Sequence, residues 1–218
     1  MGNTRDGFKF AMLIAAFTFL FQTVVMALDQ NQVLIRFLLF VPVEFTDGLF
    51  GLDVLLLMKA LFNSVSYIFL HGSTSHLMGN MLFLIPACMG VIHFTGMKRG
   101  LFYYVFLGIG AALFFTLFHL NSHIPLLGAS GAVYGMMGMF VAFRWKNMFS
   151  EIVTPLATMG AVFFTFKTVV EVMLAIGLTF AAKESGVAHL AHVGGFGAGL
   201  LLGLYHYKIH FRPWHKRI

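Results

Sequence analysis

Long apolar runs, separated by short polar or charged stretches, dominate the 218-residue sequence. The run from Phe10 to Leu28 has 19 residues, which as a helix matches the ~30 Å hydrocarbon core of a bilayer. The runs are continuous rather than alternating, which excludes a membrane β-barrel. The pattern predicts one all-α, polytopic membrane domain over residues 1–218. Its six spanning helices are expected at about residues 10–28, 75–94, 101–119, 127–143, 167–182 and 187–207.

Two long stretches do not fit a single span. Residues 29–74 carry several charged side chains and are predicted to form a large outer loop, with short helices partly sunk in the membrane interface. Residues 100–143 contain no charge but are too long for one crossing. The polar sequence from His119 to Pro125 interrupts them, so we expect two helices joined by a tight outer turn.

The region from Ile152 to residue 182 has two interpretations. Pro155 and Gly160 favour an interfacial stretch, followed by a helix that begins near Lys167. The alternative is one helix over residues 152–182, which would bury Lys167 and Glu171 in the membrane as an i,i+4 pair. We prefer the first interpretation, in which these two residues pair at a helix end.

Charged residues are few and lie mostly at the ends of the apolar runs. They make up 10% of the chain, against about 25% in soluble domains, so a water-soluble globule is excluded. The net charge of +6 does not indicate nucleic-acid binding, because orientation by cytoplasmic Lys and Arg explains it. With both termini inside, 11 of the 14 Lys and Arg residues are cytoplasmic, including those of the basic tail at 208–218. Without a transit peptide, we expect a bacterial plasma membrane.

Polar residues gather near the predicted outer ends of the second, fourth and sixth helices. These three helices enter the membrane from the same side, so residues near their N-terminal ends share a depth. The residues are His76, Asn80, Ser130, His189 and His192. A Ser hydroxyl becomes a nucleophile when a neighbouring base takes its proton, and neutral His is the usual base near pH 7. The pattern therefore predicts that Ser130 and His192 form a nucleophile–base pair.

The same level also offers donors for a developing oxyanion. Asn80 carries an amide and lies one helical turn after His76. The first backbone N–H groups of a helix, here near Ala129 and Ser130, have no intrahelical partner and lie at the positive end of the helix dipole. Such donors stabilise the tetrahedral intermediate of acyl transfer. These groups are therefore candidates for an oxyanion hole.

Glycines recur at four-residue spacing on the fourth and sixth predicted helices. The pairs are Gly131 with Gly135, and Gly195 with Gly199. Pairs of this kind let two helix backbones approach closely. A short contact between Ser130 and His192 requires such an approach, so we expect these glycines to support the site.

Three segments together resemble a known family. They are His71-Gly72-Ser73-Thr74-Ser75-His76-Leu77-Met78-Gly79-Asn80, Gly128-Ala129-Ser130-Gly131-Ala132-Val133-Tyr134-Gly135 and Ala191-His192-Val193-Gly194-Gly195-Phe196-Gly197-Ala198-Gly199. In motif, order and host helix they resemble the rhomboid intramembrane serine proteases. The resemblance covers about Phe10 to Tyr207. It implies a six-helix rhomboid-like bundle that cuts transmembrane helices of other proteins.

The resemblance also implies roles for the matching residues. Ser130 would be the nucleophile and His192 the general base, in a dyad without an acidic member. His76, Asn80 and the Ser130 backbone amide would form the oxyanion hole, and Tyr134 would pack against the His192 ring. The fifth helix would act as a lateral gate for substrates. The implied partners are transmembrane protein substrates and the lipid bilayer, with no cofactor and no metal.

The match to the family pattern is incomplete. Gly128 and Ala129 match the motif before the serine and would support it. The second helix, however, lacks the family's usual Glu after Gly90 and contains Pro86. The family's Trp-Arg pair is also missing from residues 29–74, which contain no Trp. These departures concern the anchoring of the first loop more than the chemistry.

Three other functions stay open. A catalytically inactive rhomboid-like protein would bind membrane clients without cutting them. A membrane metallohydrolase would take its ligands from His71, His76, His189 and His192. Against it, the HExxH spacing is absent, and the second, fourth and sixth helices carry no inner acid that could complete a site. A small-solute transporter would need charges in mid-membrane, which only the less favoured interpretation of Lys167 and Glu171 provides.

Overall fold

A computed structural model describes residues 4–29, 32–146, 154–180 and 188–210 of the chain. The helices are α1 Thr4–Leu28, α2 Val33–Leu38, α3 Pro42–Phe50, α4 Val54–Ser66, the 3-10 helix η1 Tyr67–Phe69, α5 Thr74–Thr95, α6 Met97–Leu117, α7 Ser130–Trp145, α8 Thr154–Phe180 and α9 His189–His210. Within the described ranges, the only β-type pairing is an isolated antiparallel bridge between Phe40 and Leu126. The protein has the predicted all-α, polytopic membrane fold.

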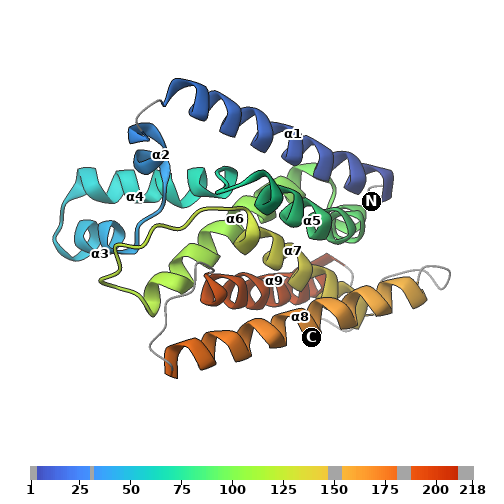
Figure 1. Ribbon diagram of the computed structural model, residues 1–218. Coiled ribbons are helices and arrows are strands. Elements are labelled where there is room, and N and C mark those ends of the chain that lie inside the picture. Colours follow the sequence, from blue (N-terminus) through green and yellow to red (C-terminus); the bar gives the residue numbers. More distant parts are fainter. Residues whose placement is uncertain (1–3, 30–31, 147–153, 181–187, 211–218) are drawn as a thin grey trace.

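Helices α7 and α9 form the centre of the bundle. Figure 1 shows α1 along one edge and α8 along the opposite edge, with α7 and α9 between them. The central α7 packs against α5, α6, α8 and α9, whereas α8 packs mainly on α7 and α9. Twelve of the 16 residues of α7 are buried. The candidate motifs of the fourth and sixth predicted helices therefore lie in the middle of the molecule.

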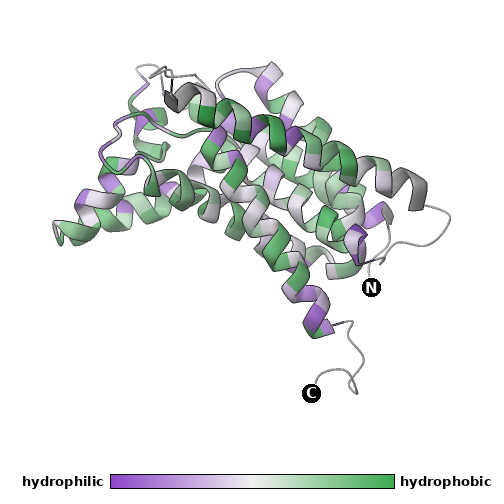
Figure 2. Ribbon diagram, turned by 90° about the horizontal axis from the view of Figure 1, so that it is seen from below, coloured by the Kyte–Doolittle hydropathy of each residue, from purple (hydrophilic) through white to green (hydrophobic). Residues whose placement is uncertain are grey.

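Within the part of the chain that the structure describes, four helices are long and apolar enough to cross a membrane, judged by length and composition alone. They contain Arg5–Leu28, Thr74–Thr95, Met97–Leu117 and Thr158–Gly177. Figure 2 shows hydrophobic residues along most of the helical surface, and hydrophilic residues near ends such as the last turn of α9. Large apolar side chains such as Phe17, Leu20 and Phe166 are exposed on α1 and α8, as expected for surfaces that face lipid. Helix α7 has 16 residues and α9 carries five Gly and four His, so neither qualifies on these grounds alone.

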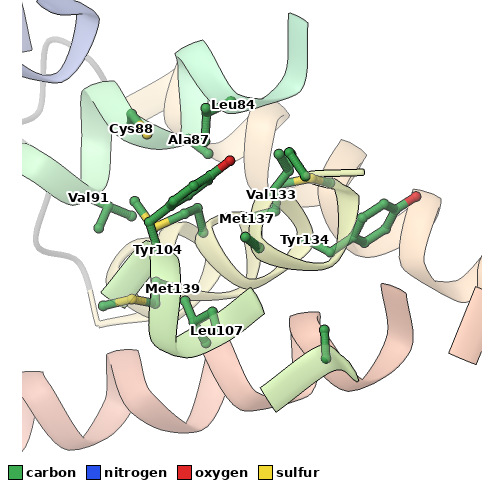
Figure 3. Close-up of a cluster of buried hydrophobic side chains, with 14 of the residues drawn as sticks. Leu84, Ala87, Cys88, Val91, Tyr104, Leu107, Val133, Tyr134, Met137 and Met139 are labelled. Carbon is green, nitrogen blue, oxygen red and sulfur yellow. The ribbon is translucent and has the colours of Figure 1, made fainter. Parts of the chain in front are cut away.

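A tightly packed apolar cluster joins α5, α6 and α7. Figure 3 shows Leu84 and Cys88 of α5, Tyr104 of α6 and Met137 of α7 meeting there. All four of these side chains are fully buried. The Tyr134 hydroxyl points away from this cluster (Figure 3). The cluster therefore fixes α7 from one side and leaves Tyr134 directed toward other partners.

The fifth predicted helix is longer than the preferred interpretation of the sequence proposed. Helix α8 runs unbroken over Thr154–Phe180, so Lys167 lies at its midpoint and not at its start. Pro155 falls in the first helical turn, where its missing N–H costs no hydrogen bond. Gly160 faces the Phe140 ring of α7, where a Cβ atom would meet ring carbons at 3.4 and 3.5 Å. The preferred interpretation was wrong because neither residue interrupts the helix.

Other predicted boundaries differ by a few residues. Helix α7 begins at Ser130, where the prediction began at 127. Helices α1 and α6 begin at Thr4 and Met97, earlier than the predicted 10 and 101. The predicted end of the fifth helix at 182, the start of the sixth at 187, and most of the basic tail at 208–218 lie outside the described residues.

The predicted outer loop contains α2, α3, α4 and η1, and polar contacts hold these elements together and attach them to α6. The buried Asn63 amide donates to the carbonyl oxygens of Phe37 and Leu39, both at 2.9 Å. The Tyr67 hydroxyl donates to the Gly108 carbonyl of α6 at 2.7 Å. The Lys59–Glu44 ion pair joins α4 to α3 at 2.6 Å. The loop is thus anchored without the family's Trp-Arg pair.

Candidate active site

Ser130 and His192 meet between the N-terminal ends of α7 and α9. The Ser130 Oγ atom lies 2.8 Å from the His192 Nε2 atom, although 62 positions separate the two residues in sequence. Ser130 is the first residue of α7, and His192 is the fourth residue of α9. The His192 side chain is buried and Ser130 is half-buried. A hydroxyl held this close to an imidazole nitrogen can transfer its proton to that nitrogen.

Glycines permit the close approach of α7 and α9 at this point. A Cβ atom on Gly195 would overlap the Gly131 carbonyl oxygen, and one on Gly199 would overlap the Gly135 carbonyl oxygen. On its own side-chain face, Gly131 lies against Ala111 of α6, where a Cβ atom would stand 2.6 Å from the Ala111 Cβ. The α9 glycines thus make room for α7, and Gly131 makes room for α6.

Tyr134 lies one turn after Ser130, and its ring stacks on the face of the His192 ring. The two rings are parallel within 3°, with their centroids 4.4 Å apart. The Tyr134 hydroxyl donates a hydrogen bond to Glu171 Oε1 at 2.8 Å. Tyr134 therefore restricts the orientation of the imidazole that faces Ser130.

An acidic side chain contacts His192, contrary to the expectation of a dyad without an acid. Glu171 of α8 places Oε2 3.1 Å from His192 Nδ1 and 2.5 Å from His189 Nδ1. Its Oε1 atom accepts from Lys167 Nζ at 3.1 Å, in addition to Tyr134. The sequence interpretation missed this contact because it placed Glu171 at a helix end. The available signal was the acid itself, since an ionisable residue within an apolar span is by default a candidate functional residue.

The candidate oxyanion groups lie around Gly128, two residues before Ser130. A Cβ atom on Gly128 would stand 2.8 Å from His76 Cε1 and 3.8 Å from Asn80 Nδ2, so both side chains border this glycine. Gly128 has φ +112°, a conformation that favours glycine. Ala129 is the N-cap of α7, so the Ser130 N–H belongs to the first helical turn, whose N–H groups have no intrahelical partner. The structure thus gathers His76, Asn80 and the Ser130 backbone around one turn.

His71, a possible metal ligand or structural residue on the sequence alone, lies among these groups. Its Nε2 atom is 2.9 Å from Asn80 Nδ2 and accepts a hydrogen bond from the Ala129 N–H at 3.2 Å. The Gln22 side chain bonds to both the N–H and the carbonyl of His71, each at 3.0 Å. Burial, together with the nearby His76, lowers the pKa of His71 to about 4. Neutral His71 therefore holds the Asn80 amide and the turn before Ser130 in place.

One group of side chains has the spacing of a metal site. The ligand atoms of Glu171, His189 and His192 all lie within 4.8 Å of one another. Two His and one Glu can bind zinc in enzymes. Within the described ranges, His71 and His76 do not join this group. A metal ion would therefore be bound by Glu171, His189 and His192, and not by four histidines. Helix α8 supplies the acidic ligand that the second, fourth and sixth predicted helices lack.

These features define a class of protein: an all-α membrane bundle with a serine–histidine pair between the N-terminal ends of two central helices. Residues 58–209, well over half of the chain, match the family described as "Rhomboid domain". The chain belongs to the rhomboid family.

Plant proteins of this family resemble the chain in sequence. RHOMBOID-like protein 4 of Arabidopsis thaliana is 34% identical over 137 residues, which are 62% of this chain and 31% of that protein. RHOMBOID-like protein 1 of the same plant is 32% identical over 136 residues, which are 62% of this chain and 32% of that protein. The matched part of the chain thus spans about a third of the length of these two relatives.

Proposed function

We propose that this protein is an intramembrane serine endopeptidase that hydrolyses peptide bonds in or near transmembrane helices of other proteins. The observation that carries this proposal is the 2.8 Å contact between Ser130 Oγ and His192 Nε2 at the start of α7. Membership of the rhomboid family supports it. The adjoining oxyanion candidates add the third element that acyl transfer needs.

In the proposed mechanism Ser130 Oγ attacks the scissile carbonyl carbon while His192 Nε2 takes the hydroxyl proton. Asn80, His76 and the Ser130 N–H stabilise the negative oxygen of the tetrahedral intermediate. Protonated His192 then gives its proton to the leaving amine, which yields an acyl-enzyme on Ser130. Water attacks this ester with His192 again as the base, which releases the carboxylate product and restores the serine.

The substrate must present an extended segment at the start of α7. A helical substrate has its carbonyl groups hydrogen-bonded, so it must unwind locally, and Gly or Pro makes this easier. Helix α8 lies at an edge of the bundle (Figure 1) and contacts α5 through the stacked rings of Phe83 and Phe163, with centroids 6.0 Å apart. We infer that substrates enter from the bilayer between α5 and α8.

Both termini are proposed to be cytoplasmic, so that the site opens to the outer face. The Lys and Arg residues at the N-terminal end of α1 and the C-terminal end of α9 support this orientation. Lys167, one of the 11 residues expected on the cytoplasmic side, gives this orientation no support, because it lies midway along α8. Water needed for hydrolysis would then reach Ser130 from outside.

The test is cleavage of a model transmembrane substrate by the detergent-solubilised protein. Wild type is compared with Ser130→Ala and His192→Ala, and with Ser75→Ala as a control for an exposed serine near the same end of the bundle. We expect cleavage by wild type and Ser75→Ala and none by the other two variants. Cleavage that persists in Ser130→Ala would refute the serine mechanism. A wild type that binds the substrate but never cuts it would favour the inactive client-binding alternative.

A metal-dependent hydrolase is the second candidate, because Glu171, His189 and His192 converge. A chelator added to the same assay separates the two. The serine mechanism predicts unchanged cleavage, whereas a metal-dependent enzyme would lose activity with chelator and regain it with zinc. Ser130→Ala would also retain activity if a metal-bound water were the nucleophile.

A further inference from the structure

We propose that Glu171 is the positioning acid for His192, so that the site works as a Ser130–His192–Glu171 triad. This inference rests on the proposed protease function and adds one residue to its machinery. Three helices then supply the triad: α7 the nucleophile, α9 the base and α8 the acid.

The Glu171 carboxylate is buried and fully hydrogen-bonded. Its side chain is 7% exposed. Oε1 accepts from the Tyr134 hydroxyl at 2.8 Å and from Lys167 Nζ at 3.1 Å. Oε2 contacts His189 Nδ1 and His192 Nδ1. An ionised carboxylate has about four acceptor positions, so these four partners use its whole capacity.

The charge of Glu171 determines which nitrogen of His192 carries the proton. An ionised carboxylate can only accept hydrogen bonds, so its contact with His192 Nδ1 requires a proton on Nδ1. Neutral imidazole carries one ring proton, which leaves Nε2 with a free lone pair. That lone pair faces Ser130 Oγ at 2.8 Å. Glu171 thus selects the tautomer in which His192 can accept the serine proton, and its charge stabilises the imidazolium that forms.

Tyr134 and Lys167 keep Glu171 in this position. A charged residue inside an apolar bundle is costly unless it is paired and hydrogen-bonded. Lys167, one turn earlier on α8, supplies the opposite charge. Tyr134 donates to the carboxylate while its ring stacks on His192. The side chains of Glu171, His192 and Tyr134, from three different helices, therefore restrict one another's orientation.

The test separates orientation of His192 from general support of the fold. Glu171→Gln keeps the shape but replaces one oxygen with an N–H donor, and Glu171→Asp keeps the charge. For Glu171→Gln we expect kcat to fall about 100-fold or more with little change in KM. Glu171→Asp should recover part of that loss. The matched control is Glu44→Gln, which removes another ion-paired acid far from Ser130 in sequence and should leave kcat unchanged.

A spectroscopic measurement keeps the proposal testable even if Glu171→Gln fails to fold. ¹⁵N chemical shifts of the histidine rings, assigned by the loss of signals in His192→Ala, report which ring nitrogen is protonated. In wild type near pH 7 we expect His192 to be protonated on Nδ1. A wild-type His192 protonated on Nε2, or a folded Glu171→Gln with wild-type kcat, would overturn the role of Glu171.

The outcomes also distinguish this inference from the proposed function. If Ser130→Ala is inactive and Glu171→Gln is fully active, the protease stands and the triad fails. If Ser130→Ala still cleaves, the protease mechanism itself fails, and the shifts of His192 still report on its contact with Glu171.

Discussion

Gly199 of α9 lies against the carbonyl oxygen of Gly135 of α7 so closely that no side chain fits between them. This contact brings the two backbones together more than one helical turn after Ser130 in α7 and after His192 in α9. Gly199→Ala should therefore push α9 away from α7, lower stability by about 1–3 kcal/mol and strongly reduce cleavage. Gly197→Ala is the matched control, because a Cβ atom there meets nothing within 4 Å. Equal melting temperatures and activities for the two variants would contradict this packing role.

Asn80 is expected to stabilise the oxyanion during the reaction. Loss of one such donor costs about 10²–10³-fold in kcat, so Asn80→Ala should fall in that range with a modest change in KM. The exposed Asn121 lies in the turn before α7, and Asn121→Ala should behave as wild type. A kcat for Asn80→Ala within about twofold of wild type would remove Asn80 from the oxyanion hole.

Stability should decrease as the pH falls below about 6.5, in part because of His71. Burial lowers the pKa of His71 to about 4, from an ordinary value of 6.5. Between these values the unfolded chain binds a proton at His71 that the folded protein does not, so unfolding is favoured as the pH falls, and this effect levels off below about pH 4. Thermal melts in detergent from pH 7 to 4.5 should show a weaker pH dependence for His71→Gln than for wild type. The exposed His123 provides the control, and His123→Gln should follow wild type. Identical pH dependence in all three proteins would contradict the prediction.

The first loop should depend on a buried amide more than on its surface ion pair. Asn63 is fully buried and donates to two carbonyl groups, so Asn63→Leu leaves both without that donor, at about 1–3 kcal/mol for each buried group. Lys59→Met breaks a partly exposed ion pair, for which about 0–1 kcal/mol is typical. Melting temperatures in detergent compare the two variants directly. A larger loss for Lys59→Met would show that the ion pair is the main anchor.

The pattern of apolar runs was enough to predict the helices that enclose the site. Continuous apolar sequence needs no tertiary information to identify a membrane helix, so α1, α5 and α6 were expected near their observed positions. The GxxxG spacing likewise indicated the close contact of α7 with α9. The polar residues near the starts of α5, α7 and α9 then pointed to Ser130, His192 and Asn80.

The contribution of α8 to the candidate site could not be predicted from the sequence. Pro155 and Gly160 are helix breakers by propensity, but their effect depends on position: one lies in the first turn and the other packs against Phe140. A local rule could not show this, so Glu171 was placed at a helix end. Its contact with His192, 21 positions away, depends on how α8 packs against α9. His71 was likewise placed among the candidate oxyanion groups only by tertiary structure.

Covalent labelling of Ser130 tests the proposed chemistry most directly. A fluorophosphonate reacts with a serine whose proton a neighbouring base removes, and mass spectrometry of the labelled protein identifies the modified residue. We predict a single adduct on Ser130 in wild type, none in Ser130→Ala, and labelling in His192→Ala slower by a factor of about 100 or more. Labelling of a different residue, or wild-type labelling of Ser130 in His192→Ala, would contradict a serine nucleophile activated by His192.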